Sequence, residues 1–497
     1  MVNSQTTQLS FPAQAAESKN IFWWLISACV ICGFLHVAMG SDPLVPLLAI
    51  IAMAMGIMSI TGFGVMNIGA VLVFFIAFRY VGFPLFAKLF FGQALDTNLE
   101  NPLSAFLAVA IGVFAYFIGF IFINRVDIGL PLLRPVTQHC LLRRISYFSF
   151  LIGCVAHLEN AFRVNLLTSA WNISNAFMPF LHLALISAAA SSISRSKGRR
   201  LFDVWTVVVL VLEIIFSFVQ NARVMMFEAI LALILTDMAF RGKITKKQIA
   251  GALIAVLLLV IITPVFLFTR GFRDDLNWKE RISFTIKTFA GWKEADVALL
   301  EYWHRVSLRR GFDLSYYGKP ANLLERVSLV NNTDLFMNGA DNIGVLKFEV
   351  INQAVEYSLP RFFAPDKPAD YSEGDWLHYY YTGEYRYGNF LSSPLIGVGY
   401  VSFGWIGVFV FPLFVGTMVF LIVKKATSLD IRSNIWAIFI LVSISNAFIE
   451  GGMRANVAVI LRQLPQEIIV MVLISVFVGV NKVLLFNRDR VFGSGAK

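Results

Sequence analysis

Two histidines and two acidic residues in one polar segment could accept a proton during catalysis. The segment covers residues 270–393 and is rich in Trp, Tyr, Arg, Asp and Asn, whereas the chain around it is strongly hydrophobic. A neutral histidine is a natural general base near physiological pH, so His304 and His378 are candidates. Glu301 and Asp366 could serve in the same role. The residue types do not choose among these four, and a single histidine on a helix is more often structural.

Arginines near the ends of hydrophobic stretches could bind a phosphate or pyrophosphate group. A guanidinium group stays charged and donates paired hydrogen bonds that fit phosphate oxygens. On the outer side of a membrane such residues run against the usual charge bias, so each needs a reason. For Arg79, Arg163 and Arg462 we expect an ion pair or a position at the membrane interface. The candidate pyrophosphate-binding residues are Arg223, Arg270, Arg273, Arg361 and Arg454.

Aromatic side chains crowd the end of the polar segment and could bind sugar rings, whose C–H faces are apolar. The candidates are Trp376, Tyr380 and Tyr385, which alternate with charged residues. Such aromatic residues fit protein packing equally well. The sequence contains no His, Cys, Asp and Glu cluster with metal-site spacing and no nucleotide-binding glycine motif. We therefore expect neither a metal nor another cofactor.

The composition is that of an integral membrane protein. Of the 497 residues, 58% are hydrophobic and 14% are charged, whereas a soluble domain carries about 25% charged residues. The formal net charge of +10 could suggest a nucleic-acid partner. In a membrane protein, however, Lys and Arg collect in cytoplasmic loops. We therefore expect no nucleic-acid partner.

Hydropathy predicts an all-α polytopic membrane protein with twelve spans, because about 20 apolar residues cross the bilayer core. Glu213 and Glu228 are the main charged residues inside these spans, and the histidines there lack metal-ligand spacing to one another. The predicted spans are 21–39, 43–61, 65–84, 103–123, 144–159, 171–190, 203–219, 224–240, 248–269, 403–423, 433–450 and 466–486.

Basic residues predict the orientation. They concentrate in four loops, near 125–144, 195–200, 241–247 and 424–432, and these loops alternate correctly if both termini are cytoplasmic. The polar segment then faces the periplasm or the cell exterior. The predicted organisation is a cytoplasmic tail at 1–20, nine spans in 21–269, the large outer loop at 270–393, three spans in 394–487 and a cytoplasmic tail at 488–497.

Two further patterns concern the outer loop and its exit. Residues 292–310 repeat apolar positions at helical spacing and predict an amphipathic helix. Residues 394–407 are apolar and spaced by glycines, which is typical of a re-entrant piece leading into the next span.

The end of the outer loop resembles a known family. Residues 360–368, PRFFAPDKP, are similar to the PR-x-x-x-PDKP stretch of bacterial oligosaccharide repeat unit polymerases, the O-antigen polymerase (Wzy-like) group. Asn221-Ala222-Arg223 stands where that group often has a short turn before a span. Val398 and Ser402 depart from the pattern, where an acidic residue and Asn are common. Further similar positions are Ser393, Pro394, Gly397, Tyr400, residues 403–407 and Gly416.

The resemblance implies a fold like the GT-C class of membrane glycosyltransferases in a bacterial inner membrane. It implies that a growing sugar chain moves from undecaprenyl pyrophosphate to a hydroxyl of the next lipid-linked unit at the periplasmic face. Arginines would neutralise the departing pyrophosphate. The implied partners are lipid-linked oligosaccharide substrates, membrane lipids, a chain-length regulator and a flippase.

Two other functions stay open at this point. An O-antigen ligase-like enzyme would use the same donor and the same arginine chemistry, with lipid A core as the acceptor. A transporter of polysaccharide or lipid-linked sugar would show broken helices and polar groups at mid-membrane. The concentration of polar residues in the outer loop favours an enzyme over a transporter.

Overall fold

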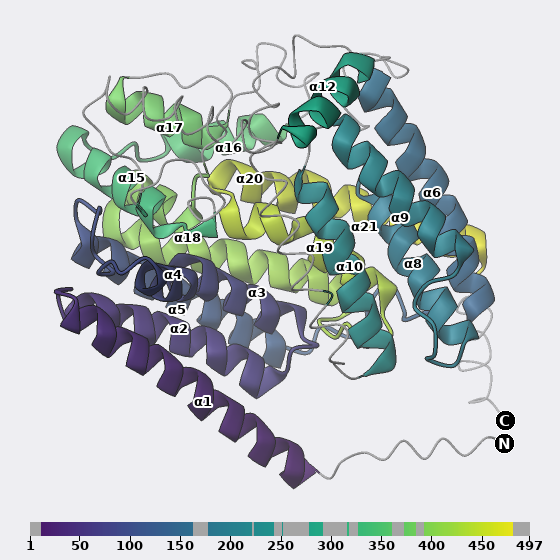
Figure 1. Ribbon diagram of the computed structural model, residues 1–497, viewed down its shortest axis with the longest axis horizontal. Coiled ribbons are helices and arrows are strands. Elements are labelled where there is room, and N and C mark those ends of the chain that lie inside the picture. The colour runs from purple at the N-terminus through teal and green to yellow at the C-terminus, as the bar shows by residue number, and fades with distance from the viewer. Residues whose placement is uncertain are drawn as a thin grey trace, which may run out of the picture.

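The computed structural model describes most of the chain, and every regular element in the described part is a helix (Figure 1). An all-α fold is therefore confirmed for this part of the chain. The described residues are 11–162, 177–220, 223–242, 251, 278–291, 316–317, 327–359, 372–383 and 392–480.

Seven helices are long and apolar enough to cross a membrane, which confirms a membrane protein with several spans. Three shorter apolar helices are α8 (Phe180–Arg195), α9 (Val204–Val219) and α19 (Ile435–Glu450). The eighth predicted span coincides with α10 (Arg223–Arg241), which carries four charged residues. The ninth lies outside the described residues apart from residue 251, so the total of twelve stays a prediction. The seven long candidates are Asn20–Ala38, Leu44–Phe63, Ile68–Phe90, Pro102–Arg125, His139–Asn160, Leu395–Thr427 and Met453–Val478.

Some helix boundaries differ from those predicted by hydropathy. The first helix, α1 (Phe11–Ala38), begins before the predicted span at residue 21. The sixth predicted span begins at 171, whereas α8 begins at Phe180. The third span contains a π-helical turn, η1 (Phe78–Gly82), between α3 (Ile68–Ala77) and α4 (Phe83–Phe90). Such turns often mark functional positions, and this one carries Arg79.

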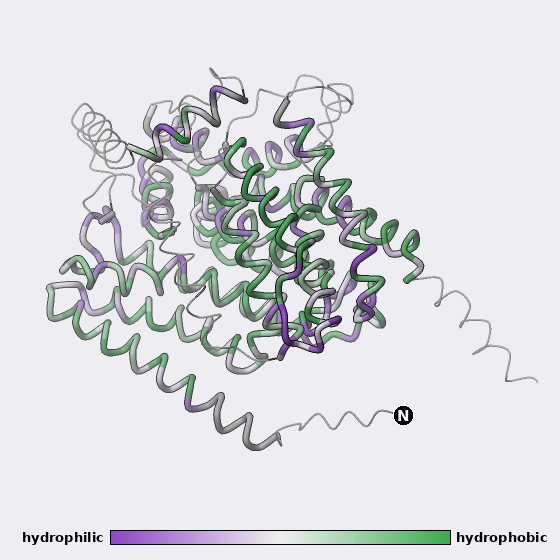
Figure 2. The backbone as a smooth tube through the Cα atoms, turned by 45° about the vertical axis from the view of Figure 1, so that its right-hand side comes forward, coloured by the Kyte–Doolittle hydropathy of each residue, from purple (hydrophilic) through white to green (hydrophobic). Residues whose placement is uncertain are grey.

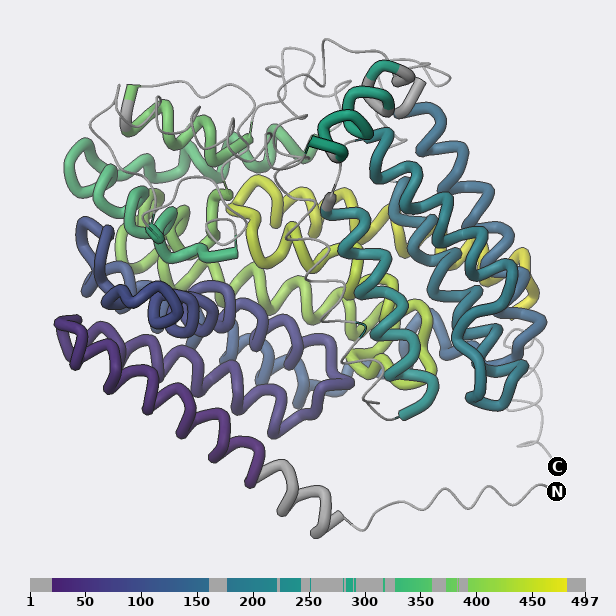
Figure 3. The backbone as a smooth tube through the Cα atoms, viewed as in Figure 1, coloured from purple at the N-terminus to yellow at the C-terminus, as the bar shows by residue number. Residues whose placement is uncertain are grey.

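The helices form two groups with a third set between them (Figures 1 and 3). The first group holds α1 to α5, and the second holds α6 and α8 to α10. The C-terminal helices lie between the groups, because α18 packs against α5, α19 against α3, α8 and α10, and α21 against α6. The bounds not yet given are α2 (Leu44–Phe63), α5 (Pro102–Arg125), α6 (His139–Phe162), α18 (Leu395–Thr427), α20 (Met453–Ala458), η2 (Val459–Gln463) and α21 (Leu464–Val478).

The described parts of the four basic loops lie at one end of the bundle, where they contact one another or neighbouring residues. The common side agrees with the alternation predicted from charge, while its identity as the cytoplasmic side stays a prediction. The contacts are the N–H of Leu133 to the carbonyl of Ala426 at 2.8 Å, the N–H of Ser433 to the carbonyl of Ala239 at 3.2 Å, and the ion pair of Arg143 with Asp203.

Four described helices of the polar segment lie together beyond the opposite end of the bundle (Figure 1). Hydrophobic residues follow the membrane helices, while hydrophilic residues gather in these four helices and at the helix ends (Figure 2). We call them the outer helices. They are α12 (Trp278–Ala290), α15 (Val330–Ile343), α16 (Glu349–Ser358) and α17 (Glu373–Thr382).

Carboxylate and carbonyl groups fasten the polar segment to the bundle. Asp334 of α15 accepts the N–H groups of Glu100 and Asn101, at 2.7 Å and 2.9 Å, at the N-terminal end of α5. The buried ammonium of Lys88 donates to the carbonyl of Tyr316 and lies 3.9 Å from the centre of its ring. These contacts satisfy helix-end groups that would otherwise be buried without a partner.

The helix α18 is broken near its start. Its backbone leaves the helical region at Phe403 and Gly404, and Gly404 has a φ of 59° that favours glycine. A Cβ atom on Gly399 would touch the carbonyl of Gly407, although eight residues span about 12 Å in a continuous helix. The short leg at 395–402 must therefore fold back against the longer leg. This break falls inside the piece at 394–407 that the sequence predicts to be re-entrant.

Candidate functional site

The candidate site lies at the outer end of α20, where two glycines separate this helix from α19. Gly452 caps the N-terminus of α20, which continues through η2 into α21. A Cβ atom here would collide with the Glu373 carboxylate and with the backbone and hydroxyl of Ser393. Only glycine allows this close approach. We call Glu373, Ser393, Gly452 and Arg454 the Glu373 junction.

Glu373 connects an outer helix to a membrane helix. The Ser372 hydroxyl accepts the N–H of Asp375 at 3.1 Å and so caps α17, which fixes Glu373 in its first turn. The Glu373 carboxylate accepts the backbone N–H of Arg454, with N–O distances of 3.2 Å and 3.3 Å, and the Ser393 hydroxyl at 3.0 Å. It therefore satisfies an unpaired N–H in the first turn of α20, where the helix dipole favours negative charge.

Burial is the main influence on the pKa of the Glu373 carboxyl group. Glu373 is 7% exposed. Burial raises the pKa of Glu373 to about 7, although the Arg454 N–H, the Arg454 charge and the Ser393 hydroxyl act in the opposite direction. Asp334, at the other fastening point, behaves similarly, because burial raises its pKa to about 6. Both fastening carboxyls therefore titrate close to neutral pH.

Two arginines from the same membrane helix converge on one outer tyrosine. The guanidinium of Arg454 lies 4.8 Å from the ring centre of Tyr357 in α16, and that of Arg462 lies 5.8 Å from it. Each contact has the geometry of a cation–π interaction. The two charges are thus at most about 11 Å apart, which is comparable to the screening length of about 10 Å at 0.1 M salt. Arg454 is buried and Arg462 is exposed, so one charge of the pair lies inside the protein and the other at its surface.

A third arginine beside this region already has an acidic partner. Arg79 forms an ion pair with Glu450 at 2.5 Å and donates to the carbonyl of Val327 at 3.1 Å. The ion pair predicted for Arg79 is therefore confirmed. It joins η1, the end of α19 and the start of α15, which holds three separate parts of the chain around the junction.

An aromatic surface occupies the same outer helix as Glu373. The rings of Trp376 and Tyr380 are tilted, with centres 6.2 Å apart. Tyr380 is 44% exposed and Tyr379 is 49% exposed, while Trp376 is half-buried. Exposed aromatic faces of this kind could hold a sugar ring.

The structure brings some of the predicted residues together. Arg454, Trp376 and Tyr380 belong to the region around the junction. His378 lies on α17 as well, but it is 2% exposed and faces the protein interior. Arg223 begins α10, and its side chain lies outside the described residues. Also outside the described residues are Glu301, His304, Asp366, Arg270, Arg273, Arg361 and Tyr385, together with the predicted helix at 292–310.

Sequence reasoning missed Glu373 and Tyr357 and assigned Arg462 an ion pair or a position at the membrane interface. A local signal for Glu373 exists, because Ser372-x-x-Asp375 is a helix-start pattern that places Glu373 in a first turn. The paired glycines before Arg454 indicate a close backbone approach. Neither pattern identifies the partner, which lies 81 residues away.

A second buried polar cluster lies inside the membrane helices. His182 of α8 contacts Glu213 of α9 through Nδ1 and Glu228 of α10 through Nε2, the latter at 3.1 Å. We call these residues the His182 triad. Glu213 and Glu228 are the intramembrane charges singled out in the sequence. Their common partner comes from a third helix, so sequence spacing could not reveal it.

The arrangement at the junction can bind an anion and a sugar. It offers two guanidinium groups, exposed aromatic rings and a carboxyl with a near-neutral pKa. Among the described residues, no group of three His, Cys, Asp or Glu side chains is placed to hold a metal ion. The guanidinium groups of Arg454 and Arg462 could neutralise negative charge at this site.

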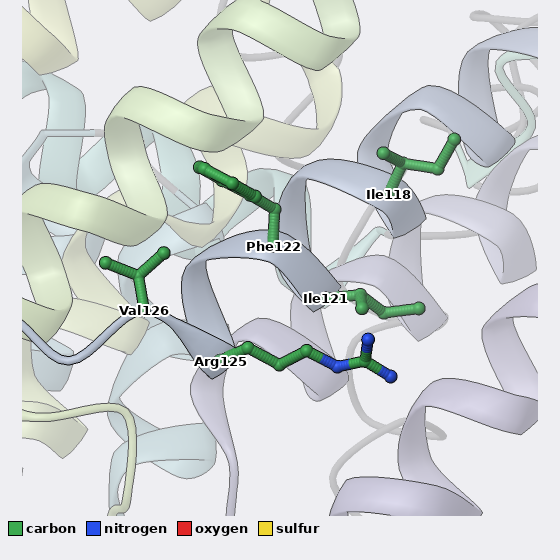
Figure 4. Close-up of a pocket in the computed structure, with 5 residues that line it drawn as sticks. All are labelled: Ile118, Ile121, Phe122, Arg125 and Val126. Atoms are coloured by element: carbon green, nitrogen blue, oxygen red, sulfur yellow. The ribbon is translucent and has the colours of Figure 1, made fainter.

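An apolar hollow of about 340 Å³ lies on α5, away from the junction (Figure 4). Its lining is Ile118, Ile121, Phe122, Arg125 and Val126. It lies near the end of α5 that faces the basic loops, and Arg125 supplies its only charged group. Such a surface suits contact with lipid rather than chemistry.

No protein-family model, curated protein or solved structure matches this chain.

Proposed function

We propose that this protein is a metal-independent membrane glycosyltransferase that polymerises undecaprenyl-pyrophosphate-linked oligosaccharide units. Its product would be a surface polysaccharide such as O-antigen, capsule or exopolysaccharide. The reaction would take place at the periplasmic face of a bacterial inner membrane, with both termini in the cytoplasm. Lipid-linked oligosaccharides would be the substrates, and a chain-length regulator and a flippase would be partners.

The convergence of Arg454 and Arg462 on Tyr357 is the observation that supports this proposal most. A lipid pyrophosphate carries its negative charge at the membrane surface, and Arg454 stands in the first turn of the candidate span Met453–Val478. As the glycosidic bond to the pyrophosphate breaks, negative charge grows on the leaving group. Fixed guanidinium groups aimed at that charge would stabilise the transition state.

The other residues of the region have distinct roles in this proposal. Glu373 is a positioning residue, because its carboxylate holds the first turn of α20 that carries Arg454. Trp376 and Tyr380 would bind a sugar ring. A side chain of the polar segment would accept the proton of the attacking hydroxyl, and His378 is too buried to do so without movement. Holding donor and acceptor together would supply proximity, worth about 7–11 kcal/mol in favourable cases.

A transporter of lipid-linked sugar is the second candidate, and two observations favour it. The α18 helix is broken at Phe403 and Gly404, and the His182 triad places charged groups inside the membrane. Both features are typical of transporters. Both features lie away from the exposed aromatic residues of α17. A transporter function gives no role to those aromatic residues.

The surface polysaccharide of a strain lacking this protein distinguishes the candidates. Loss of a polymerase leaves single repeat units, and loss of a ligase leaves polymer on the lipid carrier. Loss of a transporter leaves lipid-linked units on the cytoplasmic side. An electrophoresis gel of the surface glycan, combined with extraction of the lipid carrier, separates these outcomes, and normal long chains would contradict the polymerase proposal.

Purified protein provides the direct test. In detergent or nanodiscs with a lipid-pyrophosphate-linked oligosaccharide, we expect longer glycans and release of the lipid pyrophosphate without added metal. Arg454→Ala should lower this extension by about 10²–10³-fold, whereas Arg432→Ala, a matched arginine at the basic-loop end, should not. Equal extension by both variants would remove the junction from the active site.

A further inference from the structure

The His182 triad has a hydrogen-bond geometry that fixes its minimum proton content. Both ring nitrogens of His182 face a carboxylate oxygen, Nδ1 to Glu213 and Nε2 to Glu228. Each of these contacts needs one hydrogen between nitrogen and oxygen. Two protons therefore occupy the two contacts, whichever partner holds them, and the triad then carries one net negative charge.

One atom of the triad is left without a partner. The second carboxylate oxygen of Glu213, Oε2, is buried and has no hydrogen-bond partner among the described residues. The whole Glu213 side chain is 0% exposed. A negative charge on an unpaired oxygen in this environment is costly, whereas a proton on that oxygen makes the triad neutral.

A neighbouring carboxylate strengthens the argument. Glu467 of α21 accepts the Ser443 hydroxyl and the Gln463 amide, each at 2.9 Å, so both of its oxygens are satisfied as acceptors. It is buried and interacts electrostatically with His182 and Glu228. An ionised Glu467 adds a second negative charge to the region, which increases the tendency of the triad to hold a further proton.

The other helices around the triad contribute few charges. From α6, His157 interacts electrostatically with His182, stacks on the Phe216 ring and contacts the Gln220 amide at 2.8 Å. The same helix carries Glu159 two residues further on. The outer helix α12, which packs against α9, carries Glu280 and Lys287.

From this geometry we infer that the His182 triad is a reversible proton-binding site inside the membrane, with Glu213 Oε2 as the position of the exchangeable proton. The ligand is a proton rather than a metal ion, because the two carboxylates contact different nitrogens of the His182 ring and so do not converge with it on one point. The site goes beyond the proposed glycosyl transfer and does not depend on it.

The triad lies close to the outer end of its helices. His182 is in the first turn of α8, and Glu228 is in the second turn of α10. The Glu228 side chain is 14% exposed, against 4% for His182. Glu228 is therefore the route by which a proton reaches the buried oxygen, and the proton enters from the side of the outer helices.

Infrared spectroscopy of the purified full-length protein in nanodiscs tests this inference, because a protonated carboxyl group has a C=O band that a carboxylate lacks. Between about pH 5 and 9, we expect a band that decreases reversibly as the pH rises. The variant Glu213→Gln should lose one carboxyl's absorption, and Glu213→Asp should shift the band instead of removing it. A wild-type protein without such a band at any pH would overturn the inference, whichever variants fold.

Two control variants separate this proton from others. Glu373→Gln removes an outer carboxyl that also titrates near neutral pH and should leave the Glu213 band in place. Glu467→Gln should leave that band as well, because both Glu467 oxygens already accept hydrogen bonds. Loss of the band in Glu467→Gln, with no change in Glu213→Gln, would assign the proton to Glu467 and contradict the inference. Each variant is checked for a monodisperse profile, so a misfolded sample is not scored.

Discussion

The Glu373 junction and the His182 triad both bury a carboxyl group, but they satisfy it with different partners. Glu373 accepts a backbone N–H and a hydroxyl, neither of which changes charge near neutral pH. Glu213 contacts a histidine, whose ring can hold one or two protons, and it has one oxygen without a partner among the described residues. The partners of Glu373 keep a fixed charge, whereas the histidine partner of Glu213 can itself hold the exchangeable proton.

This difference separates two uses of buried polarity in one membrane protein. At the junction, neutral donors hold an outer helix against the start of a membrane helix, and the Arg454 guanidinium lies against the Tyr357 ring. In the triad, charged groups from three helices neutralise one another and leave a site for a proton. Variants that affect one region and spare the other therefore test the comparison directly.

The largest effect should follow from removal of the central histidine of the triad. His182→Ala leaves two buried carboxylates without their shared partner and should lower the free energy of unfolding by about 3–5 kcal/mol. His36→Ala is the matched control, because His36 is equally buried but contacts a backbone carbonyl, that of Leu85, at 2.8 Å. Thermal unfolding in detergent measures both, and equal losses would show that the triad holds no special charge.

The next effect concerns activity rather than stability. Arg454→Ala should lower glycan extension by about 10²–10³-fold, as expected when a fixed donor to a developing charge is removed. Arg432→Ala should have little effect, since its side chain is 69% exposed and pairs with Asp430. Rates of extension with a lipid-linked substrate are the measurement, and a loss below threefold for Arg454→Ala would place the anion site elsewhere.

A third prediction concerns the pH dependence of stability at the junction. Because burial raises the pKa of Glu373 from 4.5 to about 7, its contribution to stability is fully present below about pH 4.5 and is lost as the pH rises through about 7. Between about pH 5 and 8, the wild type should lose up to about 3 kcal/mol more than Glu373→Gln. Unfolding followed across this range tests the prediction.

The free energy of unfolding of the Glu373→Gln variant should still depend on pH. Asp334 also has a raised pKa, of about 6, and it is present in both proteins. The pH dependence of unfolding free energy that remains in the variant should therefore lie at lower pH than the pH dependence contributed by Glu373. Identical pH profiles for the wild type and the variant would show that Glu373 does not titrate on unfolding.

The smallest effect should come from a single added methyl group. Gly452→Ala pushes a Cβ atom into the Glu373 carboxylate and the Ser393 backbone and should cost about 1–3 kcal/mol of stability. Gly62→Ala is the control, because a Cβ atom there meets nothing within 4 Å, and Gly→Ala in a helix can add about 1 kcal/mol. A neutral Gly452→Ala would contradict the tight junction.

The sequence was sufficient to predict the helical class and several spans, because a run of about 20 apolar residues is a local property. The break in α18 was also foreshadowed, since Gly404 lies in a glycine-spaced apolar piece. The start of α8 was misplaced because hydropathy does not mark a helix end. Pro179 stands immediately before Phe180 and is the better signal for that boundary.

The candidate site was less accessible to prediction. Arg454 was singled out because an arginine at the end of an apolar span is conspicuous, and its role in binding stays a prediction. Glu373 was missed because its importance depends on Gly452 and Arg454, which are distant in sequence. The His182 triad was missed for the same reason, since each of its members occupies a different helix and looks like an isolated polar residue. Long-range convergence of this kind is a property of packing rather than of local pattern.

The contact between Glu373 and the first turn of α20 can form only late in the synthesis of the protein. Arg454 leaves the ribosome 81 residues after Glu373, which corresponds to a delay of roughly 4–16 s at about 5–20 residues per second. During that delay the outer helices have been made but still lack their attachment to α20. The last helices to be made therefore complete the outer surface, and a chain that ends before them is left with that surface unfastened.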